Sequence, residues 1–179
     1  IDWSSRRKEL MRVCDKFRSN SKEYDCIVPG SGGKDSFYAA IILKEEFGMN
    51  PLTVTWAPHP YTDWGWENFK IWIDNGLPNF LYHPNGAVHR FLSRLCLENL
   101  LHPFQPFIIG QYGFPLHCSK KFGIKLVFYG ENSAEYGNNP KDNLSPVRSY
   151  RDIGLVNNEK SFIAGITVDE ISRKYDIPM

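Results

Sequence analysis

Residues 24–37 read YDCIVPGSGGKDSF, and this stretch decides the fold that the sequence predicts. Its apolar half, Tyr24–Pro29, is typical of a short buried strand that ends at a glycine cluster. From Asp35 to Phe47 apolar residues recur at helical spacing, and Gly48 is a natural helix stop. We therefore predict a buried strand, a tight glycine-rich turn and a helix, in that order.

The same alternation of strand and helix continues along the chain. Further strands are predicted at Leu52–Trp56, Phe80–Tyr82 and Ile124–Tyr129, and further helices at Glu67–Asn75, Val88–Leu100 and Phe107–Phe122. Pro115 lies inside the last of these helices, so we expect that helix to be broken. The alternation predicts an α/β fold: a twisted parallel sheet with helices on both faces, in a Rossmann-like three-layer sandwich. Ligands of such sheets bind beyond the carboxyl ends of the strands.

The chain of 179 residues fits one domain with a small appendage. We assign residues 1–22 to an exposed, amphipathic N-terminal helical segment and residues 23–179 to the main domain. The chain begins at Ile1 and ends shortly after the charged segment Asp169–Tyr175, so we expect it to be a fragment of a longer protein. The polar segment Asn138–Lys160 is either a lid that contacts substrate or a mobile excursion.

Composition argues against several classes of protein. Lys and Arg total 21 against 20 Asp and Glu, and the resulting net charge of +1 argues against a dedicated binder of nucleic acid or acidic membranes. The apolar runs are too short to span a bilayer. Four cysteines without a CxxC pair predict reduced thiols in a cytoplasmic protein, and the five histidines lack metal-ligand spacing.

The glycine-rich turn does not match two common nucleotide-binding motifs. A Walker A loop needs its first glycine where Val28 stands. A GxGxxG fingerprint that begins at Gly30 needs its third glycine where Asp35 stands. Neither motif therefore explains the turn.

The segment Ser31–Ser36 nevertheless has the chemistry of an anion site. Gly32 and Gly33 let backbone N–H groups face an anion without a Cβ in the way. The two serines add hydroxyl donors, and the helix N-terminus adds a partial positive charge. Lys34 is suited to screen a phosphate, and Asp35 is either a Mg²⁺ ligand or a helix N-cap.

This segment, SGGKDS, resembles the SGGxDS pyrophosphate loop of the PP-loop ATP pyrophosphatases. The resemblance implies an adenine nucleotide alpha hydrolase-like fold. Members of this superfamily cleave ATP between the α and β phosphates and activate a substrate oxygen as an adenylate. A nitrogen or sulfur nucleophile then displaces AMP.

Two further segments of the sequence resemble one family within this superfamily. Residues 56–69 and 129–137 look like the N-acetyl sugar amidotransferases of lipopolysaccharide O-antigen and flagellar nonulosonic acid biosynthesis. The similarity extends over the whole chain, although members of that family are longer. One departure is Gly30, where the family pattern leads us to expect an apolar residue such as valine, and we expect this glycine to loosen the turn.

The resemblance implies a reaction and a set of site residues. The acetamido oxygen of a nucleotide-linked N-acetyl sugar would attack ATP, and ammonia would then displace AMP to leave an acetamidine. ATP and Mg²⁺ would be the cofactors. Expected ATP-binding residues are Ser31, Gly32, Gly33, Lys34, Asp35, Ser36, Thr55, Trp56, Ala57, Gly130 and Asn132. Expected catalytic residues are Lys34, Asp35 and Glu131, with Asp35 as the metal ligand.

Several roles stay open at this stage. Glu131 either binds metal, orients ammonia or stabilises the N-terminus of a following helix. Arg148 and Arg151 either grip the sugar-nucleotide diphosphate or are solvated surface, and we favour the second interpretation. No glutaminase signature is present, so the resemblance implies separate glutaminase and cyclase-like partner subunits that deliver ammonia. We expect Cys96 and Cys118 to pack in the core.

Two other functions compete with the sugar amidotransferase. One is a tRNA-modifying PP-loop enzyme of the lysidine synthase or thiolase type, which the near-neutral charge does not favour. The other is an ATP-binding module without turnover, against which the retained Asp35 and loop serines argue. Release of AMP and pyrophosphate separates the module from both enzymes.

Overall fold

The structure, a computed structural model, describes residues 1–20, 23–131, 156–157 and 160–175. The chain divides into two compact units. The first consists of Ile1–Tyr82 and Gln111–Glu131, and the second of His83–Gly110 and Asn132–Met179. The predicted main domain, residues 23–179, therefore contains the second unit and most of the first.

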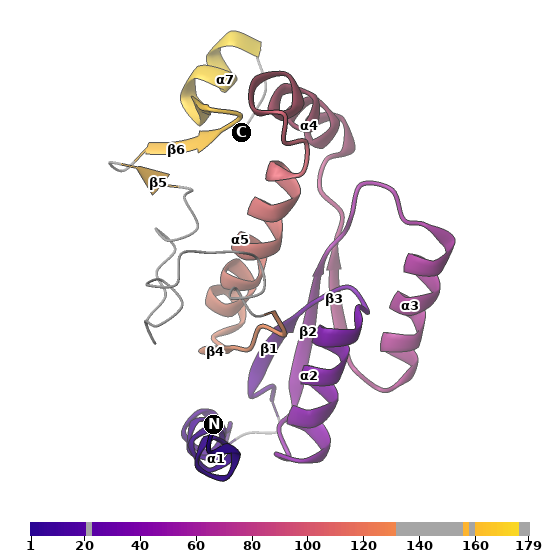
Figure 1. The fold of residues 1–179 in the computed structure, drawn as a ribbon, viewed down its shortest axis with the longest axis vertical. Coiled ribbons are helices and arrows are strands. Elements are labelled where there is room, and N and C mark those ends of the chain that lie inside the picture. Colours follow the sequence, from indigo (N-terminus) through magenta and orange to yellow (C-terminus); the bar gives the residue numbers. More distant parts are fainter. Residues whose placement is uncertain (21–22, 132–155, 158–159, 176–179) are drawn as a thin grey trace. The chain divides into compact units, whose positions relative to one another are not determined.

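The first unit is built on a parallel four-stranded sheet (Figure 1). Its strands are β1 (Cys26–Pro29), β2 (Pro51–Trp56), β3 (Asn79–Tyr82) and β4 (Leu126–Val127), in the order β3-β2-β1-β4. The helices are α1 (Trp3–Phe17), α2 (Lys34–Glu45), α3 (Asp63–Asp74) and α5 (Gln105–Phe122), which begins in the second unit. The predicted α/β Rossmann-like three-layer fold is confirmed.

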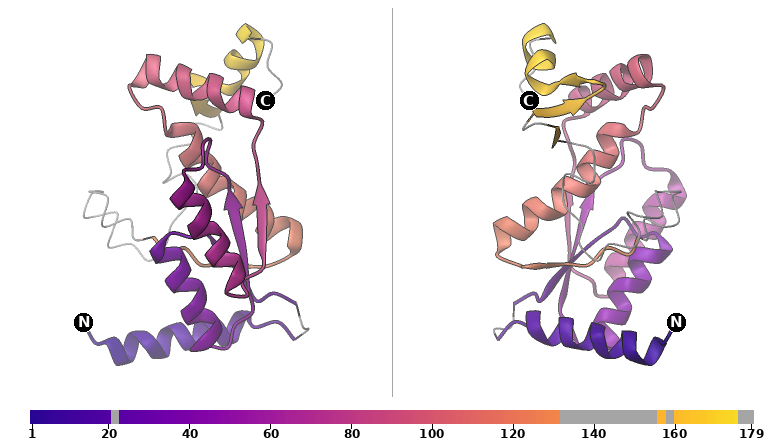
Figure 2. Two further views of the ribbon diagram at one scale, coloured as in Figure 1. Left: turned by 90° about the vertical axis from the view of Figure 1, so that its right-hand side faces the viewer. Right: turned by 60° about the vertical axis from the view of Figure 1, so that its left-hand side comes forward.

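Alternating side chains of β1 face the two outer layers. Cys26 and Val28 join a core cluster with residues of α1, α2 and α3, including the fully buried Trp72. Ile27 points the other way and packs in a cluster with Phe114 of α5. The helices α2 and α5 thus cover opposite faces of the sheet (Figure 2). Each large apolar side chain buried in these layers contributes about 1.5–3 kcal/mol of transfer free energy.

Two predicted elements differ from the structure. The prediction that the helix over Phe107–Phe122 is broken is wrong, because α5 continues through Pro115. The proline removes one backbone hydrogen bond, but its side chain is fully buried and the helix is held by the core contacts of Phe114 and Cys118. The fourth strand is shorter than Ile124–Tyr129, and Phe128 N extends its pairing by donating to Ile27 O at 2.8 Å.

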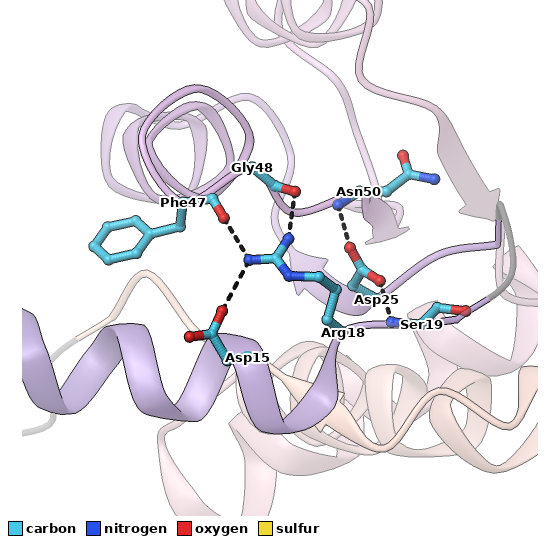
Figure 3. A network of polar contacts seen from close by, with 7 residues as sticks. All are labelled: Asp15, Arg18, Ser19, Asp25, Phe47, Gly48 and Asn50. Carbon is cyan, nitrogen blue, oxygen red and sulfur yellow. Dashed lines mark hydrogen bonds and ion pairs between the residues drawn. The ribbon is translucent and has the colours of Figure 1, made fainter.

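Polar contacts fasten the amino ends of the strands to α1 (Figure 3). The buried carboxylate of Asp25 accepts hydrogen bonds from Ser19 N at 2.5 Å and Asn50 N at 2.7 Å. Arg18 donates to Phe47 O at 2.8 Å and to Gly48 O at 2.6 Å. These bonds hold the helix end, the start of β1 and the α2–β2 turn together, at the edge of the sheet opposite the glycine-rich turn.

The second unit contains α4 (Gly86–Leu100), the first turns of α5, and a three-stranded antiparallel sheet followed by α7 (Val168–Tyr175). The strands β5 (Val156–Asn157), β6 (Lys160–Ile163) and β7 (Ile166–Thr167) pair in sequence order. Of the predicted polar loop Asn138–Lys160, these β5 residues and Lys160 are described as strand, and the rest lies outside the described residues.

The core of the second unit forms around one loop residue, Ala164. Its N–H donates to Gln105 Oε1 at 2.7 Å, and its carbonyl accepts from Asn99 Nδ2 at 3.0 Å. Leu95 and Ile171 pack in the same cluster. In the described part of the chain, no helix is both long and apolar enough to cross a membrane.

Candidate functional site

Gly30, the first residue of the glycine-rich turn, is anchored to β2 through both its N–H and its carbonyl. Gly30 N donates to Val54 O at 3.0 Å, which continues the strand pairing by one residue. Thr55 Oγ1 donates to Gly30 O at 2.6 Å. The same hydroxyl accepts a hydrogen bond from Asn79 Nδ2 of β3 at 2.9 Å. Two neighbouring strands therefore fix the orientation of the Gly30 carbonyl.

This anchoring fixes the next amide as well. The peptide between Gly30 and Ser31 is planar and trans, so its C=O and N–H point in opposite directions. Because Thr55 holds the carbonyl, the N–H of Ser31 faces away from Thr55. Ser31 itself is an exposed residue.

Two glycines of the site allow close backbone approaches. Gly32 has φ +89°, and a Cβ there would lie 2.5 Å from Asn68 O and 2.9 Å from Phe69 N in α3. A Cβ on Gly130 would lie 2.8 Å from the carbonyl carbon of Asp35. The turn after β4 therefore meets the start of α2, and the glycine-rich turn meets α3, so a side chain at either glycine would push apart the two segments that meet there.

The structure explains the departure at Gly30. A Cβ there would lie 2.2 Å from Trp72 Cη2 and 2.5 Å from Ser36 Cβ. The indole of Trp72, which is fully buried, fills the space that a valine side chain would need. The expectation that Gly30 loosens the turn stays a prediction, and the structure shows that a side chain at this position would collide with Trp72 and Ser36.

The helix α2 begins at Lys34 with Gly33 as its N-cap, and no side chain caps it. Asp35 is therefore the second residue of the helix, and the N-cap alternative for it is wrong. Its carboxylate pairs with Lys34 Nζ at 2.6 Å, and the two side chains are 56% and 89% exposed. An exposed ion pair is worth little, so both groups can exchange partners when a ligand binds. A Cβ on Gly33 would meet nothing within 4 Å, which leaves open space at the helix N-terminus.

The predicted residues of β2 divide into two groups. Thr55 and Ala57 are 1% and 0% exposed, so their side chains are buried behind the site and do not line it. Ser36 is in a similar position, because its hydroxyl donates to Gly33 O at 3.1 Å inside the turn. Trp56 does line a cavity beside the turn, together with Glu131.

This cavity has a volume of about 50 Å³ and lies entirely in the first unit. Its lining comes from the ends of β1 and β2, from α5 and from the segment after β4: Pro29, Gly30, Ser31, Val54, Trp56, Gln111, Tyr112, Pro115, Tyr129 and Glu131. Sequence reasoning missed the three residues of α5 and Tyr129. The sequence signal that could have pointed to these residues was Pro115, which lies inside an otherwise helical pattern.

Aromatic rings form one side of the cavity. The rings of Tyr112 and Tyr129 lie 5.9 Å apart, and Tyr129 Oη donates to Tyr112 O at 3.4 Å. Burial, with a smaller contribution from Tyr112, raises the pKa of Tyr129 to about 12, so the phenol stays neutral near pH 7. Trp56 packs against Phe114, with ring centroids 5.9 Å apart.

Other predicted residues lie elsewhere. Asn132, Arg148 and Arg151 are outside the described residues. All four cysteines are free and buried, and the predicted core packing of Cys96 and Cys118 is confirmed. Within the described residues, no group of three or more His, Cys, Asp or Glu is placed to hold a metal ion.

Comparison with known proteins gives limited information. No family model matches the chain. An uncharacterized protein of Methanocaldococcus jannaschii is 38% identical over 53 residues, which are 30% of this chain and 19% of that protein. The chain thus matches about a fifth of that relative's length, and the relative's description names no activity.

Proposed function

We propose that this chain is an ATP-dependent amidotransferase of the PP-loop type that acts on a nucleotide-linked N-acetyl sugar. The observation that carries the proposal is the anchored turn Gly30–Gly33, which opens onto the N-terminus of α2 at the carboxyl ends of β1 and β2. Parallel α/β sheets bind nucleotides at this edge, and helix N-termini with glycine turns bind phosphates.

The residues present fit the phosphates of ATP. The N-terminus of α2 has no side-chain cap, the space beyond Gly33 is open, and Ser31 and Lys34 are exposed beside it. Asp35 is the residue that would hold Mg²⁺, with phosphate oxygens as further ligands, since Mg²⁺ is commonly bound by one or two carboxylates together with substrate phosphates. When bound, the ion would neutralise charge on the phosphates.

The proposed chemistry needs positioning more than a protein nucleophile. The acetamido oxygen attacks the α-phosphorus of ATP, and pyrophosphate leaves with the electrons of the broken P–O bond. Ammonia then forms a C–N bond to the activated carbon, and AMP leaves with the electrons of the broken C–O bond. One proton of the nitrogen passes to solvent, which leaves the acetamidine. The N–H groups of the turn would stabilise the leaving pyrophosphate.

The source of ammonia belongs to the same proposal. Cys14, Cys26, Cys96 and Cys118 are all buried, and a buried thiol is a poor nucleophile for glutamine hydrolysis. We therefore propose that a glutaminase subunit and a cyclase-like subunit supply ammonia, and that the enzyme works in the cytoplasm, where ATP is available.

The test uses the full chain with Mg-ATP, ammonium chloride and a panel of UDP-linked N-acetyl sugars. The expected result is AMP and pyrophosphate, together with a sugar nucleotide whose acetamido oxygen has been replaced by nitrogen. A Gly32→Ala variant, whose Cβ would collide with α3, should release no AMP. AMP that appears only with tRNA would refute the sugar assignment in favour of RNA modification, and absence of AMP with every substrate would refute the enzyme.

A further inference from the structure

The cavity beside the glycine-rich turn is too small for a nucleotide. Pockets for drug-sized ligands have volumes of about 300–1,000 Å³, and a cavity volume of about 10–15 Å³ is enough to hold one water molecule. At about 50 Å³, this cavity accommodates a group of the size of a few water molecules. An occupant of that size must be recognised by the few groups that line it.

The side chains of the lining favour a cation. Three of them, Trp56, Tyr112 and Tyr129, are aromatic, and Glu131 carries a carboxylate. Aromatic rings attract cations through their quadrupole. Lys, Arg and His are absent from the lining, which consists entirely of described residues.

The backbone of α5 adds a hydrogen-bond acceptor. Pro115 has no N–H, so the carbonyl of Gln111, four residues earlier, lacks the donor that it has in a regular helix. The ring of a helical proline lies against that same carbonyl. Both Gln111 and Pro115 line the cavity, so the turn of α5 that lacks this hydrogen bond forms part of its wall.

From these observations we infer that the cavity binds ammonium, which gives up one proton to solvent to become the ammonia that the reaction consumes; this inference rests on the proposed function. Ammonium has the size of a water molecule and four N–H donors, which match the Gln111 carbonyl, the Glu131 carboxylate and the aromatic rings. Because Gly30 and Ser31 also line the cavity, the nitrogen is held beside the turn that would bind the phosphates.

The inference is tested by ammonium binding to the full chain, without ATP or sugar. Thermal unfolding is followed while ammonium chloride, potassium chloride or tetramethylammonium chloride is varied at constant ionic strength. Ammonium should raise Tm with a saturable dependence, and the larger tetramethylammonium should not. Equal stabilisation by potassium and ammonium would overturn the assignment.

Two variants and a matched control locate the site. Pro115→Ala restores the N–H that pairs with the Gln111 carbonyl, and should weaken ammonium binding about tenfold or more, the loss expected for one charge-assisted hydrogen bond. Glu131→Gln, at an exposed position, should weaken it as well. Gly113→Ala also adds a good helix former to α5, at a position with open space, and should leave binding unchanged. Equal affinity in Pro115→Ala and Gly113→Ala would overturn the inference.

The two proposals fail separately. Ammonium binding without any AMP release would leave the cavity assignment standing and refute the enzyme. If the parent chain forms AMP and the acetamidine, Pro115→Ala should raise the KM for ammonium with little change in kcat at saturation. An unchanged KM in that variant would refute the cavity assignment alone.

Discussion

The hydroxyl of Thr55 is the side-chain group of the sheet that orients the glycine-rich turn, through its bond to the Gly30 carbonyl. Removing this hydroxyl is the most direct test of that role. Thr55→Val keeps the shape of the side chain and deletes Oγ1. The Gly30 carbonyl then loses its donor at 2.6 Å, and Asn79 Nδ2 keeps its bond to Thr53 Oγ1 at 2.9 Å. Because the position is 1% exposed, water does not replace the lost bond.

The cost of this change follows from the burial. A buried carbonyl left without a donor costs about 1–3 kcal/mol. For a chain of this length each kcal/mol lowers Tm by about 2–4 °C. Urea unfolding should show this loss as a lower midpoint at unchanged slope. The freed peptide no longer fixes the N–H of Ser31, so affinity for Mg-ATP, measured by calorimetry, should fall by about tenfold or more, as expected when a preorganised charge-assisted hydrogen bond is lost.

A matched control separates stability from binding. Thr53 lies two residues earlier on β2, is fully buried, donates to Pro78 O at 2.7 Å and accepts from the same Asn79 amide. Thr53→Val should therefore cost similar stability but leave the turn and its Mg-ATP affinity intact. If both variants lose nucleotide affinity equally, or if Thr55→Val retains it, the reasoning that Thr55 orients the turn is refuted.

Three further changes probe the structure around the site. Gly30→Ala places a methyl group against the indole of Trp72 and should lower the free energy of unfolding in urea by about 1–3 kcal/mol. Gly33→Ala places its methyl group in open space and should keep the free energy of unfolding within about 0.5 kcal/mol of the parent. Burial raises the pKa of Cys26 from 9.0 to about 12. Between pH 9 and about pH 12 the thiol of Cys26 therefore stays protonated in the folded state and loses its proton in the unfolded state. The free energy of unfolding should fall as pH rises through this range, and Cys26→Ala should make that fall smaller when unfolding is measured across it. Asp25→Asn should cost about 1–3 kcal/mol, because one amide oxygen replaces a carboxylate that accepts two backbone bonds, and the exposed Asp15→Asn should change the unfolding midpoint little.

The strands and the turn could be predicted because their signals are local. A short apolar run that ends at Gly30 is typical of a buried strand, and the residues after Gly33 carry helical spacing whatever surrounds them. Pro115 was misread because a proline signals a helix break locally, while the contacts that override it come from β-strands far along the chain. The cavity could not be predicted, because it is formed by Tyr129 together with residues of α5, and no pattern in the sequence predicts that these two segments meet.

The chemistry beneath the turn gives the strongest physical reason to regard it as a site. Thr53, Thr55 and Asn79 place polar groups inside a sheet whose neighbours are apolar. Apolar side chains of the same shape would fill the space equally well, but they would leave the carbonyls of Gly30 and Pro78 without these donors. They could not hold the Gly30 carbonyl, and through it the direction of the next N–H. The network therefore stabilises the sheet and also sets one peptide of an exposed glycine turn in one orientation, as a ligand that binds that peptide would require.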